Sequence, residues 1–123
     1  MRRVCAALIL ACGLATGAGA QQVGEVEQGT GAVLRGLDKV NASTADVAIA
    51  SGASAEFGRL HIRLKECRYP AGDAAGDAYA FLTITDAMSG ETLFSGWMLA
   101  SSPALNPLEH PRYDIWVLRC KTE

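Results

Sequence analysis

The chain has 123 residues, of which 50% are hydrophobic, and its formal net charge is −2. This length suits one domain with a single hydrophobic core, and the hydrophobic content excludes a disordered chain. A mildly acidic chain without a basic stripe is also a poor candidate for binding nucleic acid or an anionic membrane surface.

The N-terminus has the residue order of a secretory signal peptide. Arg2-Arg3 precedes an uncharged apolar run over residues 4–14, and the small residues Ala18-Gly19-Ala20 follow it. This is the charged region, apolar region and A-x-A cleavage site of such a signal. The apolar run is shorter than the roughly 20 residues that cross a bilayer. We therefore expect residues 1–20 to be removed after Ala20, which leaves an exported chain without a transmembrane segment.

A lipoprotein is the alternative at this end of the chain. The stretch Ile9-Leu10-Ala11-Cys12 has the outline of a lipoprotein box, in which Cys12 would become the lipidated first residue. Leu10, however, is bulky where a small residue is usual, and the segment ahead of Cys12 is short. We therefore predict a soluble exported chain and keep the lipoprotein as the minor alternative.

Cleavage would leave two of the four cysteines, Cys67 and Cys120. An even count in an oxidising compartment indicates one disulfide. The alternatives are two free thiols, or a zinc site in which both cysteines join His61 and His110. None of these four residues shows the close spacing of a zinc motif. We therefore predict a disulfide between Cys67 and Cys120 and no metal.

The first part of the exported chain changes from polar to alternating. The polar, glycine-bearing segment 21–31 is expected to be a flexible N-terminal arm. Alternation of apolar and polar residues then predicts a single β domain over residues 32–121. Its first strand is expected over 33–40, and residues 47–57 should form two short strands separated by a bend at Ser51-Gly52.

A half-buried strand with a charged outer face is predicted over residues 60–64. Cys67 falls out of the phase of this strand, so a bulge or a strand end is expected near Lys65-Glu66. The next segment, 69–78, is rich in Gly, Ala and Asp. Its spacing matches no calcium-binding motif, and we predict a solvated loop.

The rest of the chain predicts a hairpin over residues 79–100, with its turn at 86–91, and a last strand over 113–120. About seven short strands and at most one helical turn, at 102–105, indicate an all-β fold, either a small antiparallel β-sandwich or a barrel. Aromatic residues on strands usually belong to the core. We therefore expect core positions for Phe81, Phe94, Trp97, Tyr113 and Trp116.

Four residues near the C-terminus raise the question of a hydrolase: Ser101, Ser102, His110 and Asp114. A hydrolase needs a nucleophile on a strained turn, a base within reach and an oxyanion hole. The G-x-S-x-G elbow that provides such a turn is absent. Caps and hydrogen bonds within turns account for these residue types equally well. We expect no catalytic residues and no cofactor.

The C-terminal half resembles a known family. The matching residues are Phe94–Met98, Ala100–Leu105, His110-Pro111 and then Tyr113-Asp114, Trp116, Leu118 and Cys120. Together they resemble a family of small exported alphaproteobacterial proteins that is classed as a domain of unknown function. The resemblance spans residues 32 to 120 and departs from the family in the 69–78 loop, where relatives have more proline. It implies a periplasmic location and supports the disulfide, but it implies no enzyme class or substrate.

The segment 101–114 is the candidate interaction loop. Loops longer than about 12 residues are uncommon in compact domains unless they are functional or disordered. Here Pro103, Pro107 and Pro111 restrict the chain, which disfavours disorder. The candidate interaction residues are Ser101, Ser102, His110, Arg112, Tyr113 and Asp114. The alternative is that this stretch is only a packed crossover between two strands.

These observations predict a non-catalytic protein-binding or envelope-associated module, and its partner would be another periplasmic or envelope protein. Binding sites concentrate on loops that a rigid scaffold holds in place. The second hypothesis is a small secreted hydrolase inhibitor. The third is a Ser/His hydrolase that uses Ser101 or Ser102.

Overall fold

The computed structural model describes Gly13 and residues 24–123. The predicted signal peptide, its cleavage site and Cys12 lie outside the described residues. Within the described part, no helix is long and apolar enough to cross a membrane.

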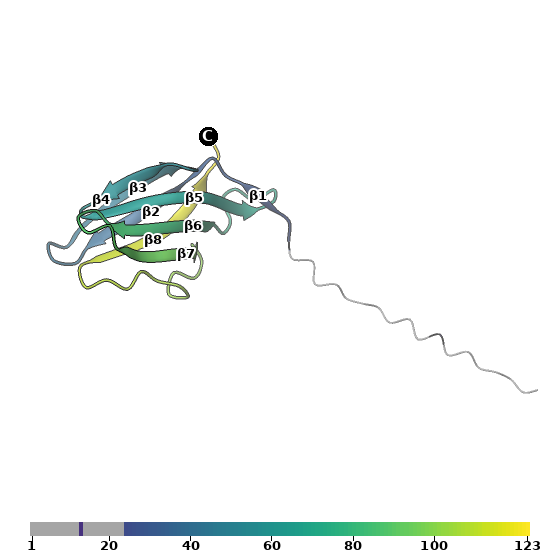
Figure 1. Ribbon diagram of the computed structural model, residues 1–123. Coiled ribbons are helices and arrows are strands. Elements are labelled where there is room, and N and C mark those ends of the chain that lie inside the picture. Colours follow the sequence, from purple (N-terminus) through teal and green to yellow (C-terminus); the bar gives the residue numbers. More distant parts are fainter. Residues whose placement is uncertain (1–12, 14–23) are drawn as a thin grey trace, which may run out of the picture.

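The described chain folds into eight strands in two antiparallel sheets (Figure 1). The larger sheet has the order β1-β5-β6-β7, with β4 also pairing with β5, and the smaller sheet has the order β3-β2-β8. No helix occurs in the described residues, and the predicted all-β class is confirmed. The strands are β1 (Val26–Gln28), β2 (Gly31–Asp38), β3 (Ser43–Ala50), β4 (Ser54–Phe57), β5 (Leu60–Pro70), β6 (Tyr79–Asp86), β7 (Thr92–Leu99) and β8 (Tyr113–Lys121).

The strand that the sequence did not predict is β1. It lies in the segment expected to be a flexible arm, and it pairs with the end of β5 in the register Val26↔Pro70 and Gln28↔Arg68. Its three residues are all exposed. Because β1 buries no side chain, it shows no hydrophobic alternation, and only its pairing with β5 makes it a strand.

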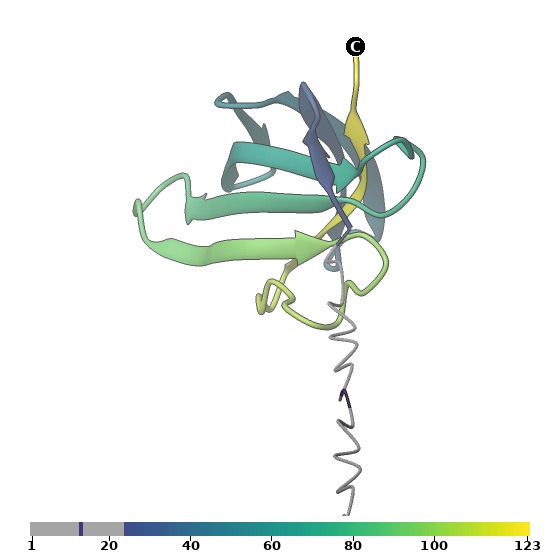
Figure 2. The same cartoon turned by 90° about the vertical axis from the view of Figure 1, so that its right-hand side faces the viewer.

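The two sheets pack face to face around an aliphatic core. Figure 2 shows β5, β6 and β7 side by side in one layer, with β8 (yellow) crossing behind them. Alternation along β6 directs Ala80, Leu82 and Ile84 inward. The largest fully buried side chains are mostly Leu and Ile, contributed by both sheets: Leu34, Ile49, Leu60, Ile62, Leu64, Leu82, Ile84 and Ile115.

Two of the three register irregularities in the described sheets, one in β5 and one in β8, affect which side chains face outward. The predicted bulge in β5 is present, because the register shifts between Leu64 and Glu66. The other bulge lies in β8. Val33 pairs with Arg119 and its neighbour Leu34 pairs with Val117, so Leu118 has no direct partner. The bulge changes the phase of β8, so that Trp116 faces outward although Cys120, four residues later, is buried.

Candidate functional site

The segment between β7 and β8, residues 100–112, covers the open side of the sandwich, where each sheet ends in an edge strand. The Leu108 side chain enters the core and is only 4% exposed. Asn106 donates a hydrogen bond from Nδ2 to the Trp97 carbonyl on the edge of β7, at 2.9 Å. Most of the predicted loop lies in this segment, whereas Tyr113 and Asp114 belong to β8.

Ser101 anchors the start of this segment to the 71–78 loop. Its Oγ donates to Asp77 Oδ2 at 2.6 Å, and its backbone N–H donates to Asp77 Oδ1 at 2.9 Å. Burial alone would raise the pKa of Asp77, but the hydrogen bonds from Ser101 and from the Ala78 N–H outweigh it and lower that pKa. Ser101 therefore fixes one loop to another.

His110 holds the turn that leads into β8. Its Nδ1 accepts hydrogen bonds from the N–H groups of Arg112 and Tyr113, at 3.0 and 3.1 Å. The His110 carbonyl accepts a further bond from Lys39 Nζ at 2.8 Å. The imidazole therefore accepts hydrogen bonds within a turn. This is the structural role that the sequence allowed as the alternative to a catalytic one.

Arg112 and Tyr113 also serve the fold. The Arg112 guanidinium binds the buried Asp38 carboxylate, with Nη2 2.9 Å from Oδ2 and Nε 3.2 Å from both oxygens. These hydrogen bonds lower the pKa of Asp38 and raise that of Arg112. Tyr113 is 2% exposed, and its hydroxyl accepts the Arg59 N–H at 3.1 Å. Tyr113 therefore belongs to the core, whereas the Arg112 side chain is paired with Asp38 and still 40% exposed.

The proposed Ser/His/Asp set is not assembled. In the described part of the chain, no hydrogen bond joins Ser101 or Ser102 to His110 or Asp114. Ser102 is exposed and closes a turn by accepting the Leu105 N–H at 3.0 Å, without a helix. Among the residues considered for recognition, Ser102 and Asp114 make no side-chain hydrogen bond or ion pair within the described part of the chain.

A groove of about 390 Å³ lies between the 100–112 segment and β8. One wall is formed by Pro103, Ala104 and Pro107, and the other by Asp114, Ile115 and Trp116. In the described sheet, β8 pairs only with β2, so its other edge has no strand partner. The Asp114 carboxylate makes no ion pair within the described residues. The groove therefore combines apolar walls with one unpaired carboxylate.

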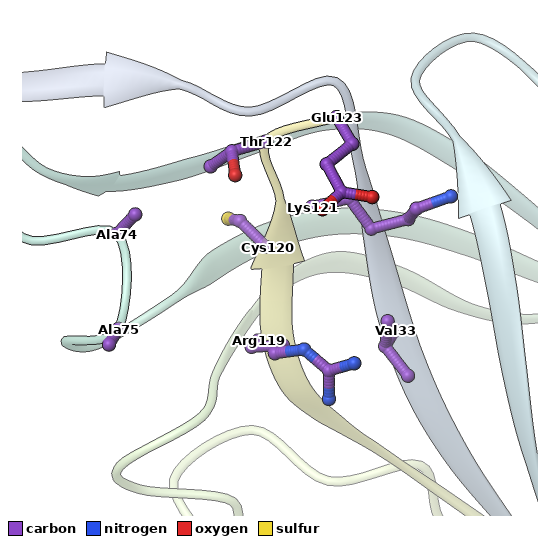
Figure 3. A pocket seen from close by; sticks show the side chains of 8 residues that line it. All are labelled: Val33, Ala74, Ala75, Arg119, Cys120, Lys121, Thr122 and Glu123. Atoms are coloured by element: carbon purple, nitrogen blue, oxygen red, sulfur yellow. The ribbon is translucent and has the colours of Figure 1, made fainter.

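A second hollow of about 320 Å³ lies where the C-terminal end of β8 meets the 71–78 loop (Figure 3). No group of three His, Cys, Asp or Glu side chains able to hold a metal ion occurs among the described residues. The hollow contains two cations and one carboxylate and offers no nucleophile with an adjacent base. Its lining residues are Val33, Ala74, Ala75, Arg119, Cys120, Lys121, Thr122 and Glu123.

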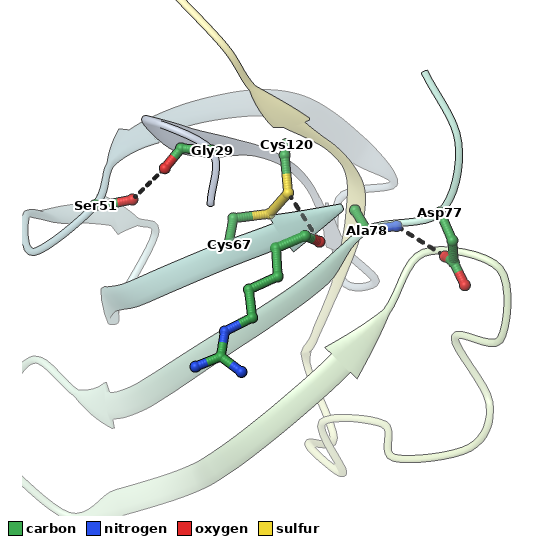
Figure 4. Close-up of a disulfide and its surroundings, with 7 residues drawn as sticks. Gly29, Ser51, Cys67, Asp77, Ala78 and Cys120 are labelled. Atoms are coloured by element: carbon green, nitrogen blue, oxygen red, sulfur yellow. Dashed lines mark hydrogen bonds between the residues drawn. A yellow bond between two sulfur atoms is a disulfide. The ribbon is translucent and has the colours of Figure 1, made fainter. Parts of the chain in front are cut away.

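The predicted disulfide joins the two sheets (Figure 4). Cys67 of β5 and Cys120 of β8 are bonded, with their Cα atoms 5.7 Å apart. Because the sulfur atoms bind each other, the alternative zinc site loses two of its four ligands. The histidines also serve elsewhere, since His61 lies 3.9 Å from Glu56 on the neighbouring strand and His110 holds a turn.

Comparison with known proteins identifies the family. Residues 32–120 match the family model described as an uncharacterized protein conserved in bacteria, DUF2155. The chain belongs to the DUF2155 family. An uncharacterized protein of Rickettsia prowazekii (strain Madrid E) is 33% identical over 87 residues, which covers 68% of this chain and 56% of that relative. The chain thus spans little more than half of the relative's length, and no solved structure matches it.

The DUF2155 domain buries only some of the aromatic residues expected in its core. Phe94 and Tyr113 are buried, whereas Phe81, Trp97 and Trp116 are partly exposed on the outer faces of the sheets. Placing these three in the core was wrong. For Phe81, the alternation along β6 could have shown the outward position. Aliphatic residues occupy the inward positions of that strand, which leaves the outward ones to aromatic rings.

Sequence reasoning also missed most of the groove in the DUF2155 domain. The 101–114 segment was identified, but its histidine and arginine were favoured over the prolines that line the groove. Trp116 was assigned to the core because the bulge at Leu118 is not visible in the sequence. The pairing of Ser101 with Asp77 was missed as well, since it joins two loops that are 24 residues apart.

Proposed function

We propose that this DUF2155 domain is a non-catalytic, exported module of the cell envelope that binds an extended segment of another protein. The groove beside β8 is the observation that supports this proposal. It has apolar walls and adjoins an unpaired strand edge. The signal-like N-terminus, the single disulfide and the family resemblance support export to the periplasm.

The two edge strands beside the groove differ in whether their free edge is covered. Exposed strand edges are usually shortened, charged or covered, because they recruit other strands. The edge of β7 is covered by Asn106, which binds the Trp97 carbonyl. The facing edge of β8 borders an open groove instead. This difference favours addition of a partner strand to β8, in which main-chain hydrogen bonds give affinity and side-chain pockets give specificity.

The groove also suggests the chemistry of the partner. Trp116 and the two prolines offer apolar contact, and aromatic residues are common anchors at interfaces. Asp114, which lies in the same wall as Trp116, adds an unpaired carboxylate. An extended segment with an apolar residue next to a lysine or arginine satisfies both features.

Site-specific crosslinking tests this proposal. A photo-crosslinking amino acid replaces Ala104 in the groove or, as the matched control, Ala48 on the exposed outer side of β3. In the producing cells, the Ala104 position should yield a discrete adduct whose crosslinked segment is basic and apolar. Equal adducts from the two positions would contradict the proposal.

Groove substitutions then test dependence on the site. Trp116→Ala and the isosteric Asp114→Asn should both reduce the Ala104 adduct while circular dichroism shows an unchanged fold. If adduct formation persists in both folded variants, the groove is not the binding site.

A small hydrolase inhibitor is the second candidate, and Leu105 is the observation that favours it. This side chain is 73% exposed, and Pro103 and Pro107 restrict the chain on either side of it. A rigid loop that presents one apolar side chain can fill a hydrolase's substrate pocket. Leu105→Ala should abolish such inhibition and leave groove binding intact, whereas Trp116→Ala should do the reverse.

A further inference from the structure

The outer face of the larger sheet displays two aromatic rings with cations above them. Phe81 and Trp97 are direct cross-strand neighbours, and their rings meet edge to face with centroids 5.4 Å apart. Lys65 Nζ lies 5.4 Å from the Phe81 centroid, and the Arg68 guanidinium lies 5.1 Å from that of Trp97. Each ring is therefore paired with a cation from β5.

This face is locally cationic although the whole chain has a net charge of −2. Two acids lie among these cations. Arg68 binds Glu66 at 2.6 Å, and Gln28 contacts the same carboxylate at 3.4 Å. Glu56 on β4 lies directly across from His61, 3.9 Å from its Nδ1, so the three cations Arg63, Lys65 and Arg68 still outnumber the acids. Arg63 and Lys65 are exposed and make no ion pair among the residues that the structure describes. The β5 bulge places Lys65 beside this face, and whole-chain composition does not reveal the resulting cluster.

The shape of the face indicates the kind of partner. It extends over β5, β6 and β7, and neither hollow identified in the described part of the chain lies on it. Edge-to-face rings below cations offer no flat platform on which a sugar ring could stack. A broad face without a groove is equally unsuited to an inserted peptide. It suits a broad anionic partner that also accepts aromatic rings.

We propose that this face, defined by Arg63, Lys65, Arg68, Phe81 and Trp97, binds the headgroup surface of an anionic phospholipid bilayer. Tryptophan rings prefer the membrane–water interface, and lysine and arginine near an anionic surface are attracted to its charge. This binding is separate from the groove, which lies beside β8 on the other sheet.

Vesicle co-sedimentation measures the effect of charge. The protein is mixed with phosphatidylglycerol–phosphatidylcholine vesicles or with phosphatidylcholine vesicles alone. We expect binding to the anionic vesicles only, and the double variant Arg63→Glu/Lys65→Glu should weaken it at least about tenfold. The matched control, Arg119→Glu/Lys121→Glu, makes the same change in net charge on β8 and should have a clearly smaller effect.

The two tryptophans of the chain report which face touches the lipid. In Trp116→Phe, the remaining Trp97 should shift its emission to the blue with anionic vesicles. In Trp97→Phe, the remaining Trp116 should show no shift. Equal losses in the two charge variants, a shift of Trp116 instead of Trp97, or a Trp97 response to soluble glycans without vesicle binding would each overturn the proposal.

Discussion

His110 and Arg112 show that a residue type suited to recognition can serve the fold instead. The sequence indicates that an arginine follows a proline in a loop, which is a common setting for a binding residue. It does not indicate that Asp38, 74 residues earlier, provides a buried carboxylate for that arginine. Such pairings depend on which strands become neighbours, here β2 and β8. The identity of the residues was thus predictable, but their partners were not.

Substituting Arg112 should lower stability more than substituting an exposed arginine of the same sheet. Arg112→Met leaves the Asp38 carboxylate buried without its partner, which is costly. The control is Arg35→Met, because the Arg35–Asp46 pair is close to half exposed on both sides. Exposed pairs of this kind contribute little. Urea unfolding should show a clear fall in midpoint for Arg112→Met and almost none for Arg35→Met, and equal midpoints would contradict this account.

At the scale of elements, alternation predicts strands well until a bulge changes the phase. The β5 bulge was predictable because Cys67 interrupts an otherwise regular alternation. The β8 bulge was not, because apolar residues occupy both phases of that strand. Ile115 and Val117 fill one phase and Trp116 and Leu118 the other. The groove could not be placed without that information.

The β4–β5 turn depends on a glycine for two reasons. Gly58 has a φ of +56°, and a Cβ built on it would lie 2.5 Å from the hydroxyl oxygen of the buried Tyr113. Gly90 in the β6–β7 turn has a similar φ of +75° but no atom within 4 Å of such a Cβ. Gly90→Ala should therefore cost about 1 kcal/mol of backbone strain. Gly58→Ala should cost about 1–3 kcal/mol more because of the steric clash.

Chemical denaturation of the two alanine variants measures this difference directly. Gly58→Ala should also disturb the near-ultraviolet signal of the tyrosines, because its added methyl group contacts Tyr113. If the two variants lose the same free energy of unfolding, the close packing between the turn and β8 contributes nothing to stability.

The whole molecule is held together by a link between its sheets. The disulfide spans 53 residues, and closing a loop of that length stabilises the folded state by about 4 kcal/mol in the chain-entropy model. The double variant Cys67→Ser/Cys120→Ser should show a corresponding loss in urea unfolding. Reductant should lower the midpoint of the unmodified protein but not that of the double variant. Insensitivity of the unmodified protein to reductant during unfolding would contradict this prediction.

Acid should destabilise the whole domain through carboxylates in both sheets and their loops. Hydrogen bonds from Arg112 hold the pKa of Asp38 below its ordinary value of 3.8, and the N–H groups of Ser89 and Met88 do the same for Asp86. The pKa of Asp77 is also lowered, since its hydrogen bonds outweigh its burial.

The direction of the effect follows from proton uptake. As the pH falls through about 4, the unfolded chain binds protons on these carboxylates before the folded domain does, so acidification favours unfolding. At pH 5–7 the titration of these groups should therefore leave the free energy of unfolding nearly unchanged. Below about pH 4 the free energy of unfolding should fall steadily.

Asp77→Asn removes one of these groups, so the variant should lose less stability than the unmodified protein over the same acid range. Urea unfolding measured at intervals from pH 7 to pH 3 tests both expectations, and a stability that stays level or rises below pH 4 would show that these carboxylates do not hold the fold.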